Sequence, residues 1–292
     1  MKFGYIAPNY GDKISAAQIL EIAELCEDLG FDSIWATDHI IMPRELKDPY
    51  GQLLEPFITL SFVAARTEKL RLGTSIIVLP QRNPILVAKQ AAALDVFSRG
   101  RVILGFGAGW AEKEFANLGA NFTARGLIYD ESIKLIRALW SQDVIDFKGD
   151  FFEVTDSLFL PKPVQGRIPI WCGGTSNSAI RRAIALGDGW HPVGLSLPEF
   201  SRGAQTIRNS GKHLVISLRM TTDVRKKREA PSGADPARWA VVSGSRAEIL
   251  GKLEEYRQAG LDYFCASILH PSAEEIKEDL RKFSSEVMAS FS

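Results

Sequence analysis

Polar side chains that can exchange protons follow several apolar runs of this sequence. Asp38 and His39 come directly after one run, and His191 and His270 lie at the ends of two later runs. Imidazole titrates near neutral pH, so each histidine is a candidate for acid–base chemistry. The alternative for each is a solvent-exposed loop histidine. These residues could also converge on a metal ion, but the first predicted strand has no His-x-His pair, and we expect no metal site.

A glycine-rich turn is the second candidate site. Gly173 and Gly174 end a short apolar run, and Thr175 precedes a predicted helix that carries Arg181 and Arg182 in its first turns. Glycine lets the backbone approach a ligand closely, and the N–H groups and dipole of a helix start suit a phosphate. The alternative is a tight turn in which serine or asparagine caps the helix.

Other patterns exclude several chemistries. The glycines at 105, 107 and 109 follow the fourth predicted strand with GxGxG spacing, whereas a dinucleotide-binding turn has GxGxxG after the first strand. No Gly-x-Ser-x-Gly elbow is present. The three cysteines, Cys26, Cys172 and Cys265, are too far apart to indicate a disulfide framework or a metal knuckle.

The elements that must position these residues alternate regularly. Residues 72–110 contain a strand, a segment with apolar residues at helical spacing and a second strand, which together form a βαβ unit. Eight strand–helix alternations favour an α/β fold of the (β/α)8 TIM-barrel type over an open doubly wound sheet. The expected strands span residues 3–8, 31–36, 70–79, 102–106, 169–172, 189–193, 213–221 and 262–269.

We expect a single domain over residues 1–292, with excursions after strands 4 and 7. The first excursion is a predicted hairpin at residues 145–154, and the second is a polar loop at residues 225–237. In a barrel the loops after the strands build the active site, so the candidate residues should meet at one end.

Composition narrows the range of partners. The 292 residues include 35 Lys plus Arg and 35 Asp plus Glu, so no net charge attracts nucleic acid or a membrane surface. No run approaches 18 consecutive apolar residues, and the first residues lack the apolar core of a signal peptide. We expect a cytoplasmic protein that acts on a small organic molecule.

Several segments together resemble a known family. They are TDHI at 37–40, the run at 72–110, ARG at 124–126, PIWCGGTS at 169–176, ALGDGWHP at 185–192 and the run at 242–264. Along its whole length the chain resembles the bacterial luciferase-like monooxygenase superfamily. That resemblance implies a TIM barrel, a cofactor that is FMN or the deazaflavin coenzyme F-420, and a homodimer.

The resemblance also implies roles for particular residues. Asp38 and His39 would lie beside the cofactor ring, and a non-proline cis peptide at Ser75-Ile76 would support the ring from behind. The implied cofactor-binding residues are Asp38, His39, Ser75, Ile76, Gly107, Gly173, Gly174, Thr175 and His191, with Trp110 in the substrate pocket.

An Asp-His pair after strand 2 resembles the deazaflavin-using branch, so we favour coenzyme F-420 and hydride transfer. Deazaflavin dehydrogenases of this superfamily often carry an acid near the position of Trp110; Glu112 and Glu114 lie slightly later, and we do not assign that role to either. His39 is the expected proton shuttle, with Asp38 orienting it or the ring. The alternative for Asp38 is a capping or salt-bridging acid.

Two alternatives for function remain. One is an FMN-dependent monooxygenase that uses dioxygen, and the other is a flavin-binding protein without catalytic activity.

Overall fold

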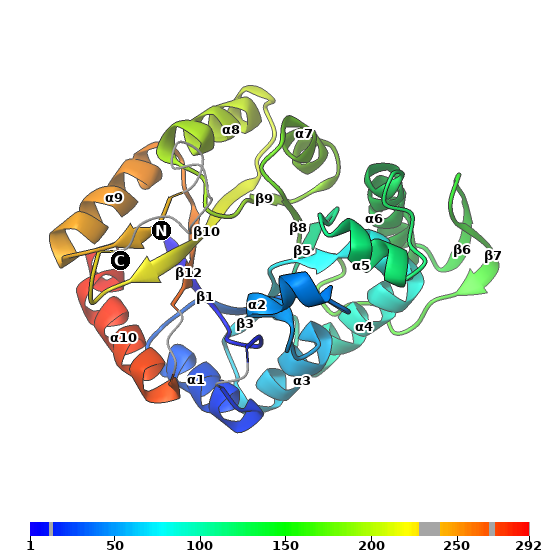
Figure 1. The fold of residues 1–292 in the computed structure, drawn as a ribbon. Coiled ribbons are helices and arrows are strands. Elements are labelled where there is room, and N and C mark those ends of the chain that lie inside the picture. The colour runs from blue at the N-terminus through cyan, green and yellow to red at the C-terminus, as the bar shows by residue number, and fades with distance from the viewer. Residues whose placement is uncertain (12–13, 228–239, 269–271, 292) are drawn as a thin grey trace.

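Eight parallel strands close into a barrel with helices around it (Figure 1). The computed structural model describes residues 1–11, 14–227, 240–268 and 272–291. Pairing runs in the order β10-β12-β1-β2-β3-β5-β8-β9 and closes between β9 and β10. The barrel strands are β1 (Lys2–Ile6), β2 (Ser33–Ala36), β3 (Arg71–Thr74), β5 (Val102–Gly107), β8 (Ile170–Gly173), β9 (Gly189–His191), β10 (Val215–Asp223) and β12 (Tyr263–Ser267).

Helices cover the outside of the barrel. The long ones are α1 (Ala16–Asp28), α3 (Pro56–Arg66), α4 (Pro84–Phe97), α6 (Arg125–Ser141), α7 (Asn177–Leu186), α8 (Leu197–Asn209), α9 (Arg246–Gln258) and α10 (Ala273–Glu286). Capping explains where several begin: Ser15 and Ser245 form capping boxes at α1 and α9, and Asn83 caps α4 ahead of a proline. No helix in the described part of the chain is long and apolar enough to cross a membrane.

The predicted TIM barrel is confirmed. Three details differ from the expected elements. The third strand is split, because β3 ends at Thr74 and β4 (Ile77–Val78) resumes after the Ser75-Ile76 bond. A short strand, β11 (Val242–Ser243), pairs with β10, and a short helix, α2 (Lys47–Tyr50), follows β2. These two elements are too short to give a hydrophobic period.

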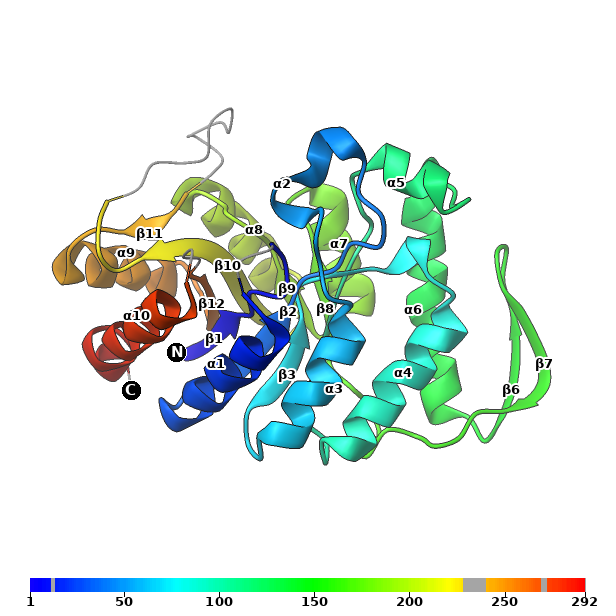
Figure 2. The ribbon, with the colours of Figure 1, turned by 60° about the horizontal axis from the view of Figure 1, so that its bottom comes forward.

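The predicted hairpin is present as β6 (Val144–Lys148) and β7 (Glu153–Leu158), and it extends beyond α6 (Figure 2). The carboxylate of Glu131 on α6 accepts hydrogen bonds from the backbone N–H groups of residues 150, 151 and 152, which fixes the hairpin tip. Most of the second expected excursion, residues 225–237, and His270 lie outside the described residues.

The barrel interior has an apolar layer and a polar layer. The apolar cluster consists of Ile6, Trp35, Ile103, Trp171, Tyr263 and Cys265. Toward the carboxyl ends of the strands the buried side chains become polar, with Thr37, Ser75, His191 and Arg219. This polar layer forms the floor of the candidate site.

Candidate active site

His39 is held by a glutamate rather than by its neighbour in the sequence. Its Nδ1 lies 2.9 Å from Oε2 of Glu114, and the two side chains are 7% and 1% exposed. Oε1 of Glu114 accepts hydrogen bonds from the N–H groups of Ile40 and Ile41 at 2.7 and 3.2 Å. Burial alone would raise the pKa of Glu114, but the hydrogen bonds from His39 and Ile40 outweigh it and lower the pKa. Glu114 is therefore ionised and accepts a hydrogen bond from Nδ1–H of His39.

Asp38 points away from that pair. Its carboxylate accepts from Nε of Arg82 at 3.2 Å, from Nη2 of Arg82 at 2.6 Å and from the backbone N–H of Val78 at 3.0 Å. Arg82 also pairs with Glu55 at 3.2 Å. The expectation that Asp38 orients His39 is therefore wrong, because the Arg82 guanidinium and a strand N–H already hold both oxygens of the carboxylate. The salt-bridging alternative describes this geometry.

The Ser75-Ile76 peptide bond is cis, which confirms the predicted bulge. Glycines on neighbouring strands make room for the Ile76 side chain. A Cβ on Gly107 would lie 1.7 Å from Cδ1 of Ile76, and one on Gly173 would lie 3.1 Å from its Cγ2. In this structure these two glycines contact Ile76, and their part in cofactor binding stays a prediction.

His191 is fully buried beneath the bulge. Its Nε2 lies 2.8 Å from Oγ of Ser75, and its Nδ1 lies 2.7 Å from Oγ of Ser217. Ser217 donates its own proton to the carbonyl of Trp190, so it accepts from Nδ1–H, and Nε2 accepts from Ser75. The ring also stacks on Trp35 at 5.0 Å between centroids. Burial, followed by the charge of Arg219, lowers the pKa of His191 to about 3.

This neutral histidine predicts a pH dependence of stability. The unfolded chain binds a proton at His191 near pH 6.5 and the folded chain only near pH 3, so the unfolded state gains protons in this window. The free energy of unfolding should therefore fall with decreasing pH, by up to about 1.4 kcal/mol per pH unit from this group. Urea unfolding across pH 3.5–6.5 should show a shallower slope for His191→Gln (about one proton fewer). The control is His213→Gln, at an exposed residue, and equal slopes in both variants would contradict the assignment.

Arg219 was not anticipated from the sequence. It is the central residue of β10 and is 8% exposed. Its Nη1 donates to the backbone carbonyl of Ser75 at 2.6 Å and lies 3.2 Å from Oγ1 of Thr37. A charged residue in an otherwise apolar strand, SLRM, is the signal that could have revealed it.

The turn before α7 is exposed to solvent, and its role in phosphate binding stays a prediction. Gly174 adopts a φ of +113°, which favours glycine, and its carbonyl accepts from Nε1 of Trp190. Ser176 caps the helix by accepting from the N–H of Ala179, while Gly174 and Thr175 are exposed. Arg182 is paired with Asp130 of α6, so it does not serve this turn as a free cation.

Aromatic side chains surround His39. Tyr50 of α2 lies 4.8 Å and Trp110 lies 5.8 Å from the imidazole, measured between ring centroids. Trp110 is 55% exposed, so it borders the site from the solvent side. Tyr50 was not anticipated, and Glu114 was named without a role, because each lies on a short helix, α2 or α5 (Glu112–Asn117), whose position depends on tertiary packing. Within the described ranges, no group of three or more His, Cys, Asp or Glu residues could hold a metal ion.

Comparisons with known proteins identify relatives of this chain. A family profile described as luciferase-like monooxygenase matches residues 1–230. An F-420-dependent glucose-6-phosphate dehydrogenase from Amycolatopsis mediterranei (strain U-32) is 28% identical over 335 aligned positions, which cover 99% of this chain and 98% of that protein.

Two solved structures share the fold. A monooxygenase from Streptomyces bottropensis matches with a TM-score of 0.83 at 21% identity, covering 100% of both chains. An F-420-dependent secondary alcohol dehydrogenase in complex with an F-420–acetone adduct matches with a TM-score of 0.80 at 22% identity, covering 99% of this chain and 98% of that one. With the profile match over most of its length, the chain belongs to the luciferase-like monooxygenase family of oxidoreductases, which use a flavin or deazaflavin cofactor.

Proposed function

We propose that this enzyme transfers hydride between coenzyme F-420 and a small organic substrate such as an alcohol. The observation that carries the proposal is the buried His39–Glu114 pair. Hydride removal from an alcohol also requires a base for the hydroxyl proton, and an imidazole oriented by an anionic carboxylate is such a base. The first relative described above is also F-420-dependent, which supports this choice over FMN.

The chain's own residues divide the work as follows. Glu114 holds Nδ1–H of His39, which leaves Nε2 to accept a proton from the substrate or return it. Trp110 and Tyr50 pack against the imidazole and reduce the access of water to it. The bound deazaflavin would supply the hydride acceptor and donor at its ring. Asp38, paired with Arg82, holds the N–H of Val78 and so fixes the strand after the bulge.

Several features of the described residues fit a phosphorylated planar cofactor. The first N–H groups of a helix lack partners within the helix, and at α7 they follow the exposed Gly174 and Thr175, where a phosphate would bind. The side-chain amide of Gln81 is buried: its N–H2 group lies toward Glu114 and helps to lower the pKa of that carboxyl, while its oxygen has no hydrogen-bond partner among these residues. A buried amide oxygen without a donor suits an N–H group at the polar edge of a ring.

The test is a pair of titrations followed by an activity screen. Quenching of cofactor fluorescence should show tight binding of coenzyme F-420 and weak binding of FMN. The F-420-loaded enzyme should then lose its oxidised-deazaflavin absorbance with at least one member of a panel of secondary alcohols and sugar phosphates. Tight binding of FMN alone, with oxygen consumption, would favour the monooxygenase. Binding without turnover across substrate classes would favour the non-catalytic alternative.

We further propose a homodimer, formed through one face of the barrel. In the described chain, all exposed large hydrophobic side chains fall between residues 40 and 164. Ten of them lie on α3, α4, the hairpin and the segment after it: Ile58, Phe62, Ile85, Leu86, Val96, Phe97, Val144, Leu158, Leu160 and Val164. An apolar patch of this extent is typical of an interface, and the commonest one is a symmetric pairing of identical patches.

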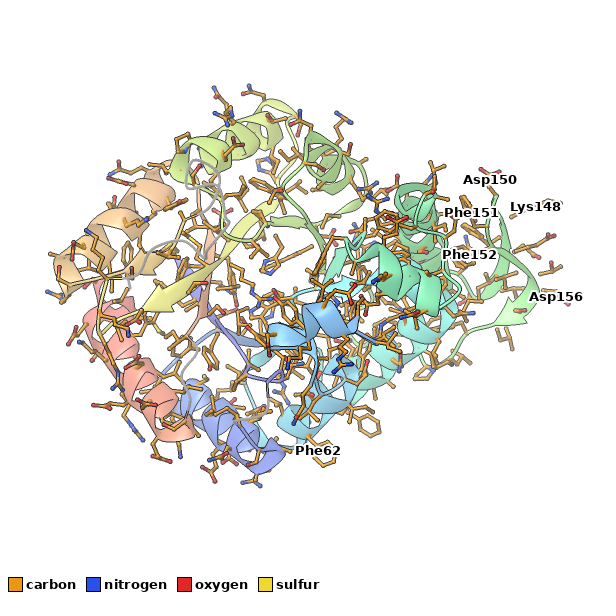
Figure 3. All side chains as sticks on the ribbon, in the orientation of Figure 1. Phe62, Lys148, Asp150, Phe151, Phe152 and Asp156 are labelled. Atoms are coloured by element: carbon orange, nitrogen blue, oxygen red, sulfur yellow. The ribbon has the colours of Figure 1, made fainter. Side chains whose placement is uncertain are left out.

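Phe62 provides the test of that interface. It is 62% exposed on α3 and points away from the barrel (Figure 3). Phe62→Glu should convert a dimer into a monomer in sedimentation equilibrium, because the charge would be buried between the two copies. Arg281→Glu, which places a glutamate on the exposed side of α10, should leave the mass unchanged. A monomeric wild-type protein, or a dimeric Phe62→Glu variant, would contradict the proposal.

A further inference from the structure

Arg219 is a buried cation without a carboxylate partner in the described part of the chain. Nη1 donates to the carbonyl of Ser75 at 2.6 Å and contacts Oγ of Ser75 at 3.3 Å and Oγ1 of Thr37 at 3.2 Å. Nη2 has one long contact, 3.4 Å to the hydroxyl of Tyr10. No described group accepts from Nε, although a guanidinium offers five N–H donors in a planar fork. The outer edge of this fork therefore remains available to a ligand.

Other partly buried arginines have more complete sets of partners than Arg219. Arg82, Arg137 and Arg182 each pair with an aspartate. Arg101 has only neutral acceptors, but its Nε, Nη1 and Nη2 all donate at 2.8–2.9 Å to oxygens at the opposite end of the barrel. Arg219 has neither an opposite charge nor a full set of acceptors. A buried charge left in that state is costly unless something else satisfies it.

The position of Arg219 links it to the candidate active site. It holds the carbonyl of Ser75 in the cis peptide and the hydroxyl of Thr37, the residue directly before Asp38 and His39. A chain of hydrogen bonds begins at this guanidinium. Arg219 donates to the hydroxyl of Ser75, Ser75 donates to His191, and His191 donates to Ser217. Because His191 is neutral, Arg219 is the cation of the polar floor.

We propose that Arg219 binds a delocalised anion at the polar floor, namely the ionised ring of the cofactor. This deepens the proposed function and rests on it. Reduced flavins and the hydroxylated deazaflavin ring both lose a proton to give a charge spread over an N–C–O edge. A planar guanidinium matches such an edge with two parallel hydrogen bonds, as it matches a carboxylate. The same fork would also accept a carboxylate or phosphate of the substrate, so the experiment separates the two sources.

The first arm measures the ring itself. Absorbance titration of bound coenzyme F-420 should show a lower ring pKa in the wild-type protein than in Arg219→Met, by about one unit or more. Above that midpoint the variant should bind the cofactor about tenfold more weakly, and below it about equally well, since one pKa unit corresponds to a factor of ten. Arg219→Lys, which keeps the charge but not the fork, should recover part of the shift.

The second arm measures the substrate as the source of the anion. Inorganic phosphate or acetate should raise the melting temperature of the wild-type protein but not of Arg219→Met if the site takes a substrate oxyanion. A shift in the first arm supports the ring, and a difference in the second arm alone supports an anion site but overturns its assignment to the ring. Equal behaviour of wild type and Arg219→Met in both arms overturns the proposal.

A failure of the proposed function would look different. If neither coenzyme F-420 nor FMN binds the wild-type protein, that function fails, while the phosphate and acetate titrations still test Arg219. Far-UV circular dichroism of both variants confirms that they fold, and Arg219→Lys provides the comparison if Arg219→Met does not.

Discussion

Replacing His39 with asparagine is expected to lower turnover about 100-fold or more, the range seen when a positioned proton-transfer group is lost. Asparagine can still donate to Glu114, so the loop and the cofactor affinity should be nearly unchanged. Steady-state reduction of coenzyme F-420 by the alcohol found in the screen gives the rate. Fluorescence quenching gives the dissociation constant in parallel.

Two controls make that result specific to His39. His213→Asn removes an exposed histidine and should leave turnover unaffected. Glu114→Gln keeps the shape of the side chain but removes its charge, and it should lower turnover less than His39→Asn does. Wild-type turnover in His39→Asn would remove this histidine from the mechanism, and loss of cofactor binding in that variant would assign it a structural role instead.

Replacing Arg82 with methionine is expected to lower the free energy of unfolding by about 3–5 kcal/mol, because it leaves a buried carboxylate without its counter-charge. The Asp38 side chain is fully buried and Arg82 is 14% exposed, so water cannot take over the role of the guanidinium. Urea unfolding monitored by tryptophan fluorescence measures the loss.

A double variant tests whether the pair acts as a unit. Arg82→Met combined with Asp38→Asn removes both charges and should be more stable than Arg82→Met alone. Additive losses, or a loss below about 1 kcal/mol in Arg82→Met, would mean that the pair is solvated in solution. Turnover retained by the double variant would show that Asp38 acts through the fold and not on the substrate.

The regular part of the fold could be predicted from the sequence because its signals are local. The apolar runs at residues 31–36 and 102–106 and the capping serine at 15 each specify an element without reference to distant residues. The run at 70–79 is equally apolar, yet the structure divides it at Ser75. Residue type alone does not reveal that division, and only the family resemblance indicated it.

The sequence predicted at which end of the barrel the candidate residues lie, but only partly which side chains pair with one another. The rule for strand ends places His39 and Asp38 correctly, because it depends on barrel topology. It cannot state which acid turns toward His39, since Glu114 lies on the short helix α5, seven residues after β5 ends. Arg219 was not predicted for another reason. Hydrophobic patterning assigns a buried strand from its apolar residues and ignores a single charged one, although a buried charge without a counter-charge indicates a possible functional site.

The packing of Ile76 against Gly107 and Gly173 has a consequence for how this sequence can change. A methyl group at Gly107 would overlap the isoleucine side chain, so position 107 cannot gain a side chain before position 76 changes. A shorter residue at 76 would relieve the restriction, and only then would alanine fit at 107. Positions 76 and 107 are therefore expected to change together among related sequences, although they are far apart in the chain.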